Sequence, residues 1–376
     1  MWTAIHKGAE FSLGGTICTT RFEPCIRQCG NILENHIQNT FLSSATSSGS
    51  VLHEPFRVCS SVNDVKQVFH NIEDNSSEAW LVDELTTPFN QISVIEVGSD
   101  SDHEFAGAYI LKLDGRDLVH SVYWHDQRVW TGAYYDEFTI LPALVPPGPI
   151  AILGLGAGTV ARLLVHEWPS RKLEGWEIDP EVVRVGRAYF GLADLEVSRQ
   201  GNPKDFDRKG RGQHVHKKVM ARGELVVHLG DALKEDAIAE GRFAGLIVDM
   251  YSKGRICEAL KDCCVWHMLR RRLIPGGRVM VNCGGPPVAN REEEVDQNAV
   301  LETEEWKMGV DATISAFSEA FNGEVNLKQL EDEGRNVILL SGPLPTLERL
   351  CVKSSSRLMS GIQGWQPQRG SVILRD

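Results

Sequence analysis

The chain has 376 residues, of which 39 are Lys or Arg and 51 are Asp or Glu, so its formal net charge is −12. An apolar fraction of 42% and a charged fraction of 24% argue against a largely disordered chain, and the length suits one large domain or two ordinary ones. No stretch of eighteen uninterrupted apolar residues occurs, so we expect no membrane span, and the acidic balance argues against broad nucleic-acid binding.

The first fifty residues form a hydroxyl-rich leader with twelve Ser or Thr, three Glu, three Lys or Arg and no Asp. This composition is consistent with an organellar transit peptide, and equally with a disordered extension. The first interpretation predicts a plastid (chloroplast) or another organelle, and the second predicts the cytoplasm. We expect an N-terminal extension over residues 1–80 before the folded part.

A small antiparallel β-domain is expected over residues 81–133. Short runs with alternating apolar residues predict strands, and Asp114 with Gly115 marks a tight turn between two of them. The three expected strands are residues 91–97, 108–113 and 118–124. Residues 135–144 then read as a short helix, and a linker rich in Pro and Gly follows at 146–149.

Strands and helices alternate over residues 134–345, which predicts an α/β domain with a mostly parallel sheet. The expected strands are residues 150–153, 173–178, 225–228, 246–248, 278–282, 325–330 and 336–341, and the last two would form a closing antiparallel hairpin. The expected helices are residues 160–167, one beginning near Pro180, 232–239, 256–273 and 308–321. Residues 346–376 are left as a C-terminal tail.

Two charged inserts interrupt this alternation. Residues 199–222 carry eight Lys or Arg against two acids, a local charge of +6 that leaves −18 on the rest of the chain. This basic insert could dock an acidic protein or nucleic-acid substrate, or it could be a solvated loop. Residues 291–305 carry seven Asp or Glu and read as an exposed acidic loop or a helix start.

The nine cysteines are scattered, which is not the pattern of a secreted disulfide scaffold and favours free thiols. Cys257, Cys263, Cys264 and His267 lie close in sequence but lack paired C-x-x-C spacing. They fall on an expected helix rich in Leu and Trp, so we interpret the thiols as buried side chains and expect no metal site.

A glycine-rich turn, Gly154-Leu155-Gly156-Ala157-Gly158-Thr159, joins the first strand of the α/β domain to its first helix. Glycines allow a sharp turn and close approach of a ligand, and the helix N-terminus offers N–H donors. A dinucleotide fingerprint would place glycine where Thr159 stands. The spacing therefore suits a nucleoside without a pyrophosphate, such as S-adenosylmethionine.

Three acidic residues stand at the ends of successive strands, where ligands of open α/β sheets bind. Glu177 is placed to accept hydrogen bonds from ribose hydroxyls, Asp231 could accept from the adenine amino group, and Asp249 would lie beside the sulfonium. Each acid alone could equally be a helix cap or a solvated loop carboxylate. Four motifs in this order indicate a nucleoside-binding domain.

These motifs resemble the spermidine-synthase-like branch of the S-adenosylmethionine-dependent methyltransferase superfamily over roughly residues 86–342. The resemblance rests further on Gln91, on Leu113-Asp114-Gly115, on Tyr135 with Glu137, and on Pro275-Gly276-Gly277. It implies a Rossmann-like class I methyltransferase fold, a mostly parallel seven-stranded sheet with a closing antiparallel hairpin, preceded by the β-unit. It also implies nucleoside contacts from Gln91, Gly154, Gly156, Gly158, Glu177, Ile178, Asp231, Ala232 and Asp249.

Two departures separate this chain from aminopropyltransferases of that branch. Ala157 stands where they look to have an aspartate that holds the aminopropyl amino group. Ser252 and Lys253 follow Asp249 where they carry a second aspartate and a proline. A diamine with two positive charges needs carboxylates to offset its desolvation, and a lysine there works against binding it.

We therefore expect an S-adenosylmethionine-dependent methyltransferase-like transferase, with Asp249 and Tyr135 as catalytic residues and an amine on a protein or small molecule as acceptor. Tyr251 could line the acceptor channel or simply pack at the rim. The first alternative is a spermidine synthase-type aminopropyltransferase of polyamine biosynthesis, which would use decarboxylated S-adenosylmethionine. The second is a catalytically silent family member that acts as a binding or dimer partner, and a homodimer stays open.

Overall fold

The computed structural model describes residues 79–114, 118–126, 128–196, 225–234, 237–285, 297–330, 336–344, 361 and 363–368. The leader, the basic insert 199–222 and most of the C-terminal tail lie outside these ranges, so the predictions made for them are not examined by the structure. Within the described part, no helix is both long and apolar enough to cross a membrane.

Four antiparallel strands form the N-terminal sheet in the order β1-β2-β3-β4. The strands are β1(Ala79–Thr86), β2(Gln91–Val97), β3(Ala108–Leu113) and β4(Val119–Trp124). Three of these were predicted from their alternation. β1 was not, and its pairing with β2 shifts register between Leu81 and Asp83, which is a bulge that breaks strict alternation along an edge strand.

The main sheet has the order β14-β12-β13-β11-β8-β5-β6-β7. Its central strands β5(Ile150–Leu153), β6(Leu173–Glu177), β7(Leu225–Leu229), β8(Phe243–Val248) and β11(Leu273–Asn282) pair in parallel. The hairpin strands β12(Val325–Gln329) and β13(Val337–Ser341) pair antiparallel, as predicted. Two tail residues, β14(Gln366–Pro367), add an eighth short strand beside β12. The seven longer strands confirm the expected class I methyltransferase arrangement.

Strand order determines where a ligand can enter. The chain runs outward from β5 to β6 and β7 and then returns to β8 on the other side of β5. The carboxyl ends of β5 and β8 therefore meet at a topological switch point, which is the usual binding crevice of open α/β sheets. Every side chain of Ile150–Leu153 is buried, so this crevice stands on a rigid central strand.

The helices differ from the predictions at several points. The expected helix 135–144 is a 3₁₀ helix, η1(Tyr134–Ile140), followed by α3(Leu141–Leu144), and the expected helix 256–273 divides into η3(Glu258–Lys261) and α6(Cys263–Arg271). The expected helix 308–321 begins earlier, as α7(Gln297–Ala320), inside the acidic insert. The expected helix 232–239 is wrong, because residues 231–234 and 237–241 form turns.

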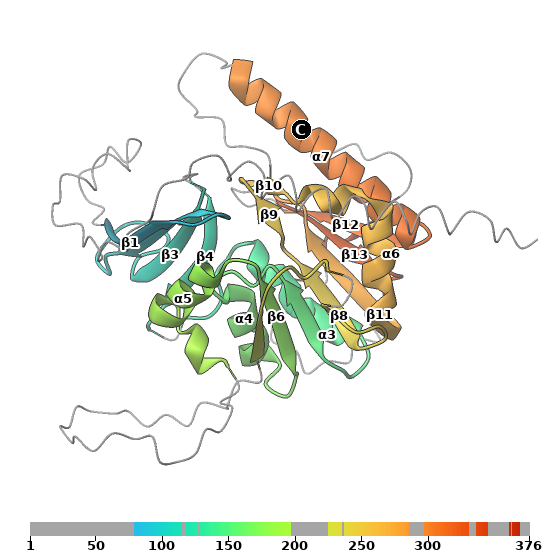
Figure 1. The fold of residues 1–376 in the computed structure, drawn as a ribbon, viewed down its shortest axis with the longest axis horizontal. Helices are drawn as coiled ribbons and strands as arrows, with labels where there is room; N and C mark the ends of the chain where they lie inside the picture. Colours follow the sequence, from blue (N-terminus) through green and yellow to red (C-terminus); the bar gives the residue numbers. More distant parts are fainter. Residues whose placement is uncertain are drawn as a thin grey trace, which may run out of the picture. The chain divides into compact units, whose positions relative to one another are not determined.

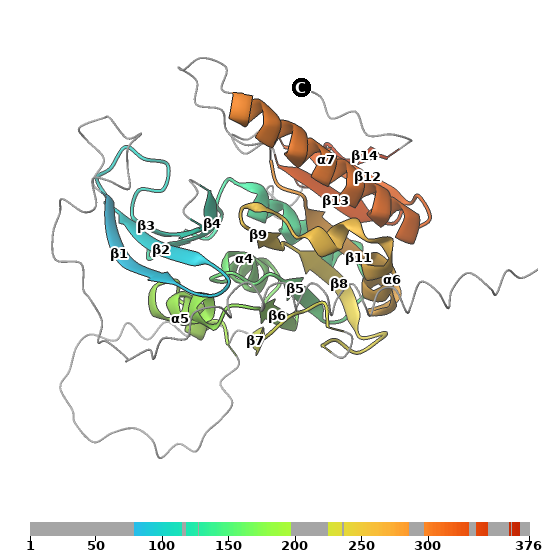
Figure 2. The same ribbon diagram turned by 45° about the horizontal axis from the view of Figure 1, so that its top comes forward.

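Helices α4(Thr159–Glu167) and α5(Pro180–Tyr189) follow β5 and β6 as predicted. Figures 1 and 2 show α5 beside the N-terminal sheet, and α6 beside α7. Apolar side chains explain the first contact, since Ile92, Val94 and Leu111 of the sheet form one buried cluster with Val182 and Val185 of α5. The N-terminal sheet is thus packed onto the part of the α/β domain that carries the glycine turn.

Candidate active site

The glycine turn brings the ends of β5 and β8 into direct contact. Gly154, Gly156 and Gly158 have φ values of +86°, +56° and +97°, a region that favours glycine. A Cβ atom on Gly154 would lie 2.1 Å from the main-chain oxygen of Asp249. Only glycine at 154 therefore lets the two strand ends approach so closely, and Asp249 is placed directly beside the turn.

Thr159, which stands where a dinucleotide fingerprint has glycine, joins the turn to the N-terminal sheet. Its Oγ1 accepts a hydrogen bond from Val122 N (3.0 Å) and donates one to Val122 O (3.2 Å). Ser121 Oγ accepts from Ala157 N at 3.0 Å. The threonine thus has a structural role that glycine could not fill, because it satisfies two main-chain groups of β4 at once.

The main-chain amides of the turn already have protein acceptors. Gly156 N donates to Glu177 Oε2 (2.9 Å), Ala157 N to Ser121 Oγ, and Gly158 N to Leu155 O (3.2 Å). A pyrophosphate-binding loop presents such amides to the ligand instead. The geometry therefore agrees with a nucleoside site that has no pyrophosphate.

Glu177 ends β6 and is buried, with 8% of its surface exposed. Burial raises the pKa of its carboxyl group, while hydrogen bonds from the N–H groups of Asp179 and Gly156 oppose the rise. Oε1 accepts from Asp179 N at 3.1 Å. The carboxylate is thus held at the strand end by two main-chain donors and keeps lone pairs that could accept from hydroxyl groups.

Gln91 is brought to this strand end by the loop before it. Thr87 Oγ1 and Asn90 Nδ2 donate to Asp179 Oδ2 at 2.6 and 2.8 Å. Asp179 has no exposed surface and also accepts from Glu181 N, as the N-cap of α5. Gln91 follows as the first residue of β2 with an exposed side chain, so the N-terminal sheet contributes to the same edge as Glu177.

Two exposed apolar side chains stand beside Glu177. Ile178 is 44% exposed, as suits a residue predicted to contact the cofactor, and Leu229, which pairs with Glu177 at the end of β7, is 58% exposed. Such apolar surface at strand ends can pack against a nucleobase. Sequence reasoning missed Leu229, although an apolar residue in the last position of a strand is a usable signal.

Asp231 and Ala232 follow β7 in a turn. Asp231 Oδ1 accepts from Leu233 N at 2.8 Å, and Ala232 is 4% exposed. The aspartate therefore caps this turn, which is the structural role considered for each acid alone. It also stands at the same edge of the sheet as Glu177.

Asp249 follows β8 and is held by two side chains. Tyr134 Oη donates to Oδ2 at 2.9 Å, and Asn282 Nδ2 donates to Oδ1 at 3.1 Å. Burial raises the pKa of Asp249 from 3.8 to about 6, and the two hydrogen bonds limit the rise. Asn282 is itself fixed, since it is 2% exposed and its Oδ1 accepts from Gly284 N.

The tyrosine hydroxyl that contacts Asp249 belongs to Tyr134, the neighbour of the expected catalytic residue Tyr135. Tyr135 is 3% exposed, and its hydroxyl donates to Val119 O at 2.7 Å. The two rings lie 4.0 Å apart between centroids. Because neighbouring residues of a short 3₁₀ helix point in different directions, one hydroxyl meets the carboxylate and the other anchors the N-terminal sheet.

Ser252 and Lys253, where this chain departs from the aminopropyltransferase pattern, lie in a small hairpin after Asp249. Tyr251–Ser252 and Arg255–Ile256 form a small hairpin, β9 and β10, and both turn residues have positive φ, +53° at Lys253 and +69° at Gly254. This is the pattern of a type I′ turn. Ser252 and Lys253 are exposed.

Tyr251 and Glu137 both make protein contacts. Tyr251 Oη donates to Asn282 O at 3.2 Å, and the Glu137 carboxylate pairs with Lys328 Nζ at 2.7 Å. Glu137 therefore ties η1 to β12, while Tyr251 packs beside the Asp249 network.

Among the described residues, Asp262, Cys263 and Cys264 have ligand atoms within 4.8 Å of one another. The three are consecutive in sequence, and Asp262 is the N-cap of α6, accepting from Cys264 N at 2.8 Å. Helix capping accounts for this arrangement.

No family model matches the chain. A protein of Bifidobacterium longum (strain NCC 2705), described as a probable polyamine aminopropyl transferase, is 29% identical over 166 residues, 44% of this chain. The match spans only 30% of that relative's own length.

A probable spermidine synthase from Corynebacterium glutamicum ATCC 13032 is a structural neighbour at 15% identity. The superposition covers 78% of this chain and 98% of the neighbour's chain, with a TM-score of 0.47. Human methyltransferase-like protein 13 in complex with SAH follows at 20% identity, 61% and 86% coverage and a TM-score of 0.35. The sequence match confirms the resemblance to the spermidine-synthase-like branch that the motifs predicted, since the Bifidobacterium longum relative is described as a probable polyamine aminopropyl transferase.

Proposed function

We propose that the protein transfers an alkyl group from a sulfonium nucleoside to an amine. The observation that carries this proposal is Asp249, a carboxylate held between Tyr134 and Asn282 at the switch point of the sheet, in contact with the glycine turn. Its pKa of about 6 suits a group that accepts a proton near neutral pH.

The strand-end residues fit a nucleoside. Glu177 can accept hydrogen bonds from ribose hydroxyls, Ile178 and Leu229 offer exposed apolar surface for the base, and Asp231 stands at the same edge. Gln91 would close this edge from the N-terminal sheet. When bound, the nucleoside supplies an activated leaving group, because its sulfur departs as a neutral thioether.

Residues of this chain would orient the acceptor amine and take its proton. The amine nitrogen forms a bond to the carbon beside sulfur, the carbon–sulfur bond breaks, and its electron pair stays on sulfur. The nitrogen must lose a proton, which Asp249 can take and pass to solvent. Tyr134 and Asn282 hold both carboxylate oxygens, so the base is oriented before the acceptor arrives.

We assign aminopropyl transfer from decarboxylated S-adenosylmethionine as the reaction, with a small aliphatic amine as acceptor. Its support is the similarity over 166 residues to a protein described as a probable polyamine aminopropyl transferase. Methyl transfer from S-adenosylmethionine is the second candidate. It is favoured by Ala157, which is 1% exposed and offers no carboxylate for an ammonium group, and by the exposed Lys253.

The co-product distinguishes these reactions. Purified protein is incubated with an aliphatic diamine and either donor, and the nucleoside products are separated by mass spectrometry. Aminopropyl transfer releases 5′-methylthioadenosine, and methyl transfer releases S-adenosylhomocysteine. We expect the first with the decarboxylated donor. Release of S-adenosylhomocysteine alone would support the second candidate, and neither product at saturating donor across a panel of amines would overturn the proposed transfer.

A further inference from the structure

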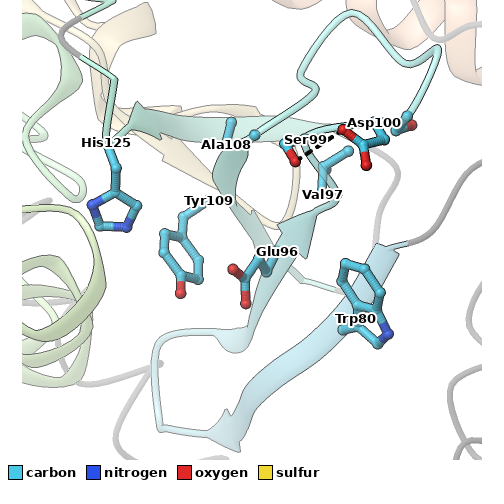
Figure 3. Close-up of a pocket in the computed structure, with 11 residues that line it drawn as sticks. Trp80, Glu96, Val97, Ser99, Asp100, Ala108, Tyr109 and His125 are labelled. Carbon is cyan, nitrogen blue, oxygen red and sulfur yellow. Dashed lines mark hydrogen bonds between the residues drawn. The ribbon is translucent and has the colours of Figure 1, made fainter.

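A cavity lies in the N-terminal sheet, and none of its lining residues belongs to the Asp249 network. It has a volume of about 610 Å³, a size typical of small-molecule sites. Its lining includes Trp80, Glu96, Asp100, Tyr109 and His125, which Figure 3 shows around one space. These residues come from β1, β2, β3 and the segments after β2 and β4, and none of them was assigned a function above.

The cavity is built on a cross-strand row of side chains. Trp80 pairs with Glu96, Glu96 with Tyr109, and Tyr109 with Tyr123. Directly opposed residues of neighbouring antiparallel strands share a face and have Cβ atoms about 4.5–5.5 Å apart. The row therefore places one carboxylate between two aromatic side chains, as Figure 3 shows for Glu96 between Tyr109 and Trp80.

The Tyr109 end of this row packs against the C-terminal end of α5 and the residue that follows it. The Tyr109 ring lies 5.9 Å from that of Tyr189 and 6.4 Å from that of Phe190, centroid to centroid. Tyr109 forms a hydrogen bond with Glu96, and burial together with the charge of Glu96 raises the pKa of the tyrosine hydroxyl. Glu96 thus stands at the margin of the apolar interface, and its carboxylate keeps acceptor capacity after this one bond.

The charge of the cavity is negative. Glu96 and Asp100 line it, the lining includes no Lys or Arg, and neither carboxylate forms an ion pair with a Lys or Arg among the described residues. Trp80 is 42% exposed, so its ring is available to a ligand. Aromatic faces and carboxylates attract the same class of ligand, an organic cation, since each places negative potential toward the bound group.

We propose that this cavity binds an aliphatic polyamine, with one ammonium group at Glu96 between Trp80 and Tyr109. The alkyl chain would cover the aromatic side chains, and a further ammonium group would lie toward Asp100. A free polyamine is favoured over a lysine side chain because two carboxylates line the cavity, whereas a lysine brings one cation. The inference does not depend on the proposed transfer reaction, since the cavity shares no residue with the Asp249 network.

Equilibrium dialysis of the full chain with labelled spermidine tests this site. We expect one site that remains in Asp249→Asn, and Glu96→Gln should weaken its affinity about tenfold, the effect of losing one charge-assisted contact. Glu84→Gln is the matched control, because Glu84 is an exposed carboxylate on β1 that does not line the cavity. Trp80→Leu, an exposed position that should fold, is expected to weaken binding severalfold.

Circular dichroism shows whether each variant is folded. If Glu96→Gln does not fold, the affinity of Trp80→Leu for spermidine is the measurement that tests the site. Equal weakening by Glu84→Gln and Glu96→Gln would overturn the proposal, since it would indicate diffuse charge attraction. Loss of the site in Asp249→Asn, or no binding at millimolar spermidine, would also overturn it. Unlabelled Nα-acetyl-lysine amide should displace the labelled spermidine less well than unlabelled spermidine does. Equal displacement by the two compounds would indicate that the cavity binds a lysine side chain, and it would refute the polyamine assignment.

Discussion

Replacing Asp249 by Asn is expected to stabilise the folded protein at pH 8 while removing the proposed transfer. In the folded state burial raises the pKa of this carboxyl group from 3.8 to about 6. The shift is about 2 pH units, and each unit corresponds to about 1.4 kcal/mol. Keeping the carboxylate ionised in the folded protein at pH 8 therefore costs about 3 kcal/mol, a cost that an uncharged amide does not carry.

The hydrogen bonds subtract from this gain. An amide at 249 can accept from Asn282 with its oxygen and donate to the hydroxyl oxygen of Tyr134, but the tyrosine proton then loses its acceptor. One lost hydrogen bond costs about 1 kcal/mol, so the expected net gain at pH 8 is about 2 kcal/mol. The cost of the buried charge develops as pH rises from 3.8 to 6 and is complete above 6. At pH 5 the expected gain is therefore below about 1 kcal/mol.

Urea unfolding followed by circular dichroism at pH 8 and pH 5 measures both values, and the co-product assay measures the loss of transfer. Asp262→Asn serves as the control, because asparagine caps a helix about as well as aspartate and should change stability by less than about 0.5 kcal/mol at either pH. An Asp249→Asn variant that is less stable than the original at pH 8 would refute the reasoning. So would a gain that is the same at both pH values.

Three further substitutions test the contacts around this residue. Tyr134→Phe removes a hydrogen bond that favours the ionised carboxylate of Asp249. The rising limb of the pH–rate profile, with its midpoint near pH 6, should therefore move to higher pH by about half a unit to one unit. Tyr135→Phe is the control and should leave this midpoint unchanged, because the Tyr135 hydroxyl donates to Val119 O instead. Thr159→Val leaves two main-chain groups of β4 without their partner and should lower the free energy of unfolding by about 1–3 kcal/mol in urea titrations; an unchanged value would contradict the joining role. Gly154→Ala would bring a Cβ to 2.1 Å from the oxygen of Asp249 at a φ of +86°, so calorimetry should show loss of nucleoside binding, and retained affinity would exclude this close approach.

The fold was predictable where one local pattern dominates. Residues 91–97 and 108–113 are short runs rich in Ile, Val and Leu and form strands with those bounds, and the order of strands and helices determines the parallel sheet. Composition did not predict the structure of residues 232–239, where Ala, Leu, Lys and Glu favour a helix. In the structure Asp231 instead caps a turn, and the chain enters β8 directly. Helical propensity is a weak preference that tertiary context overrides.

The site was predictable to the level of topology. Carboxylates at the ends of successive parallel strands must share an edge, so Glu177 and Asp249 could be placed together from sequence. The choice between Tyr134 and Tyr135 could not, because it depends on the direction of two neighbouring side chains in a 3₁₀ helix. The role of Thr159 was hidden for a different reason: its partners are main-chain groups of β4, which no side-chain pattern reveals.

Asp249 is surrounded by groups that keep their protons near neutral pH. Burial and the charge of Asp249 raise the pKa of Tyr134 and of Tyr251, and burial raises the pKa of the Cys283 thiol. Burial pushes the pKa of Asp249 upward, and the hydrogen bonds from Tyr134 and Asn282 act in the opposite direction. The balance near 6 leaves a carboxylate that is ionised at pH 7 and yet binds a proton about a hundredfold more tightly than an ordinary aspartate. Because an amine must give up a proton to accept an alkyl group, this balance is the property that the proposed reaction requires at this position.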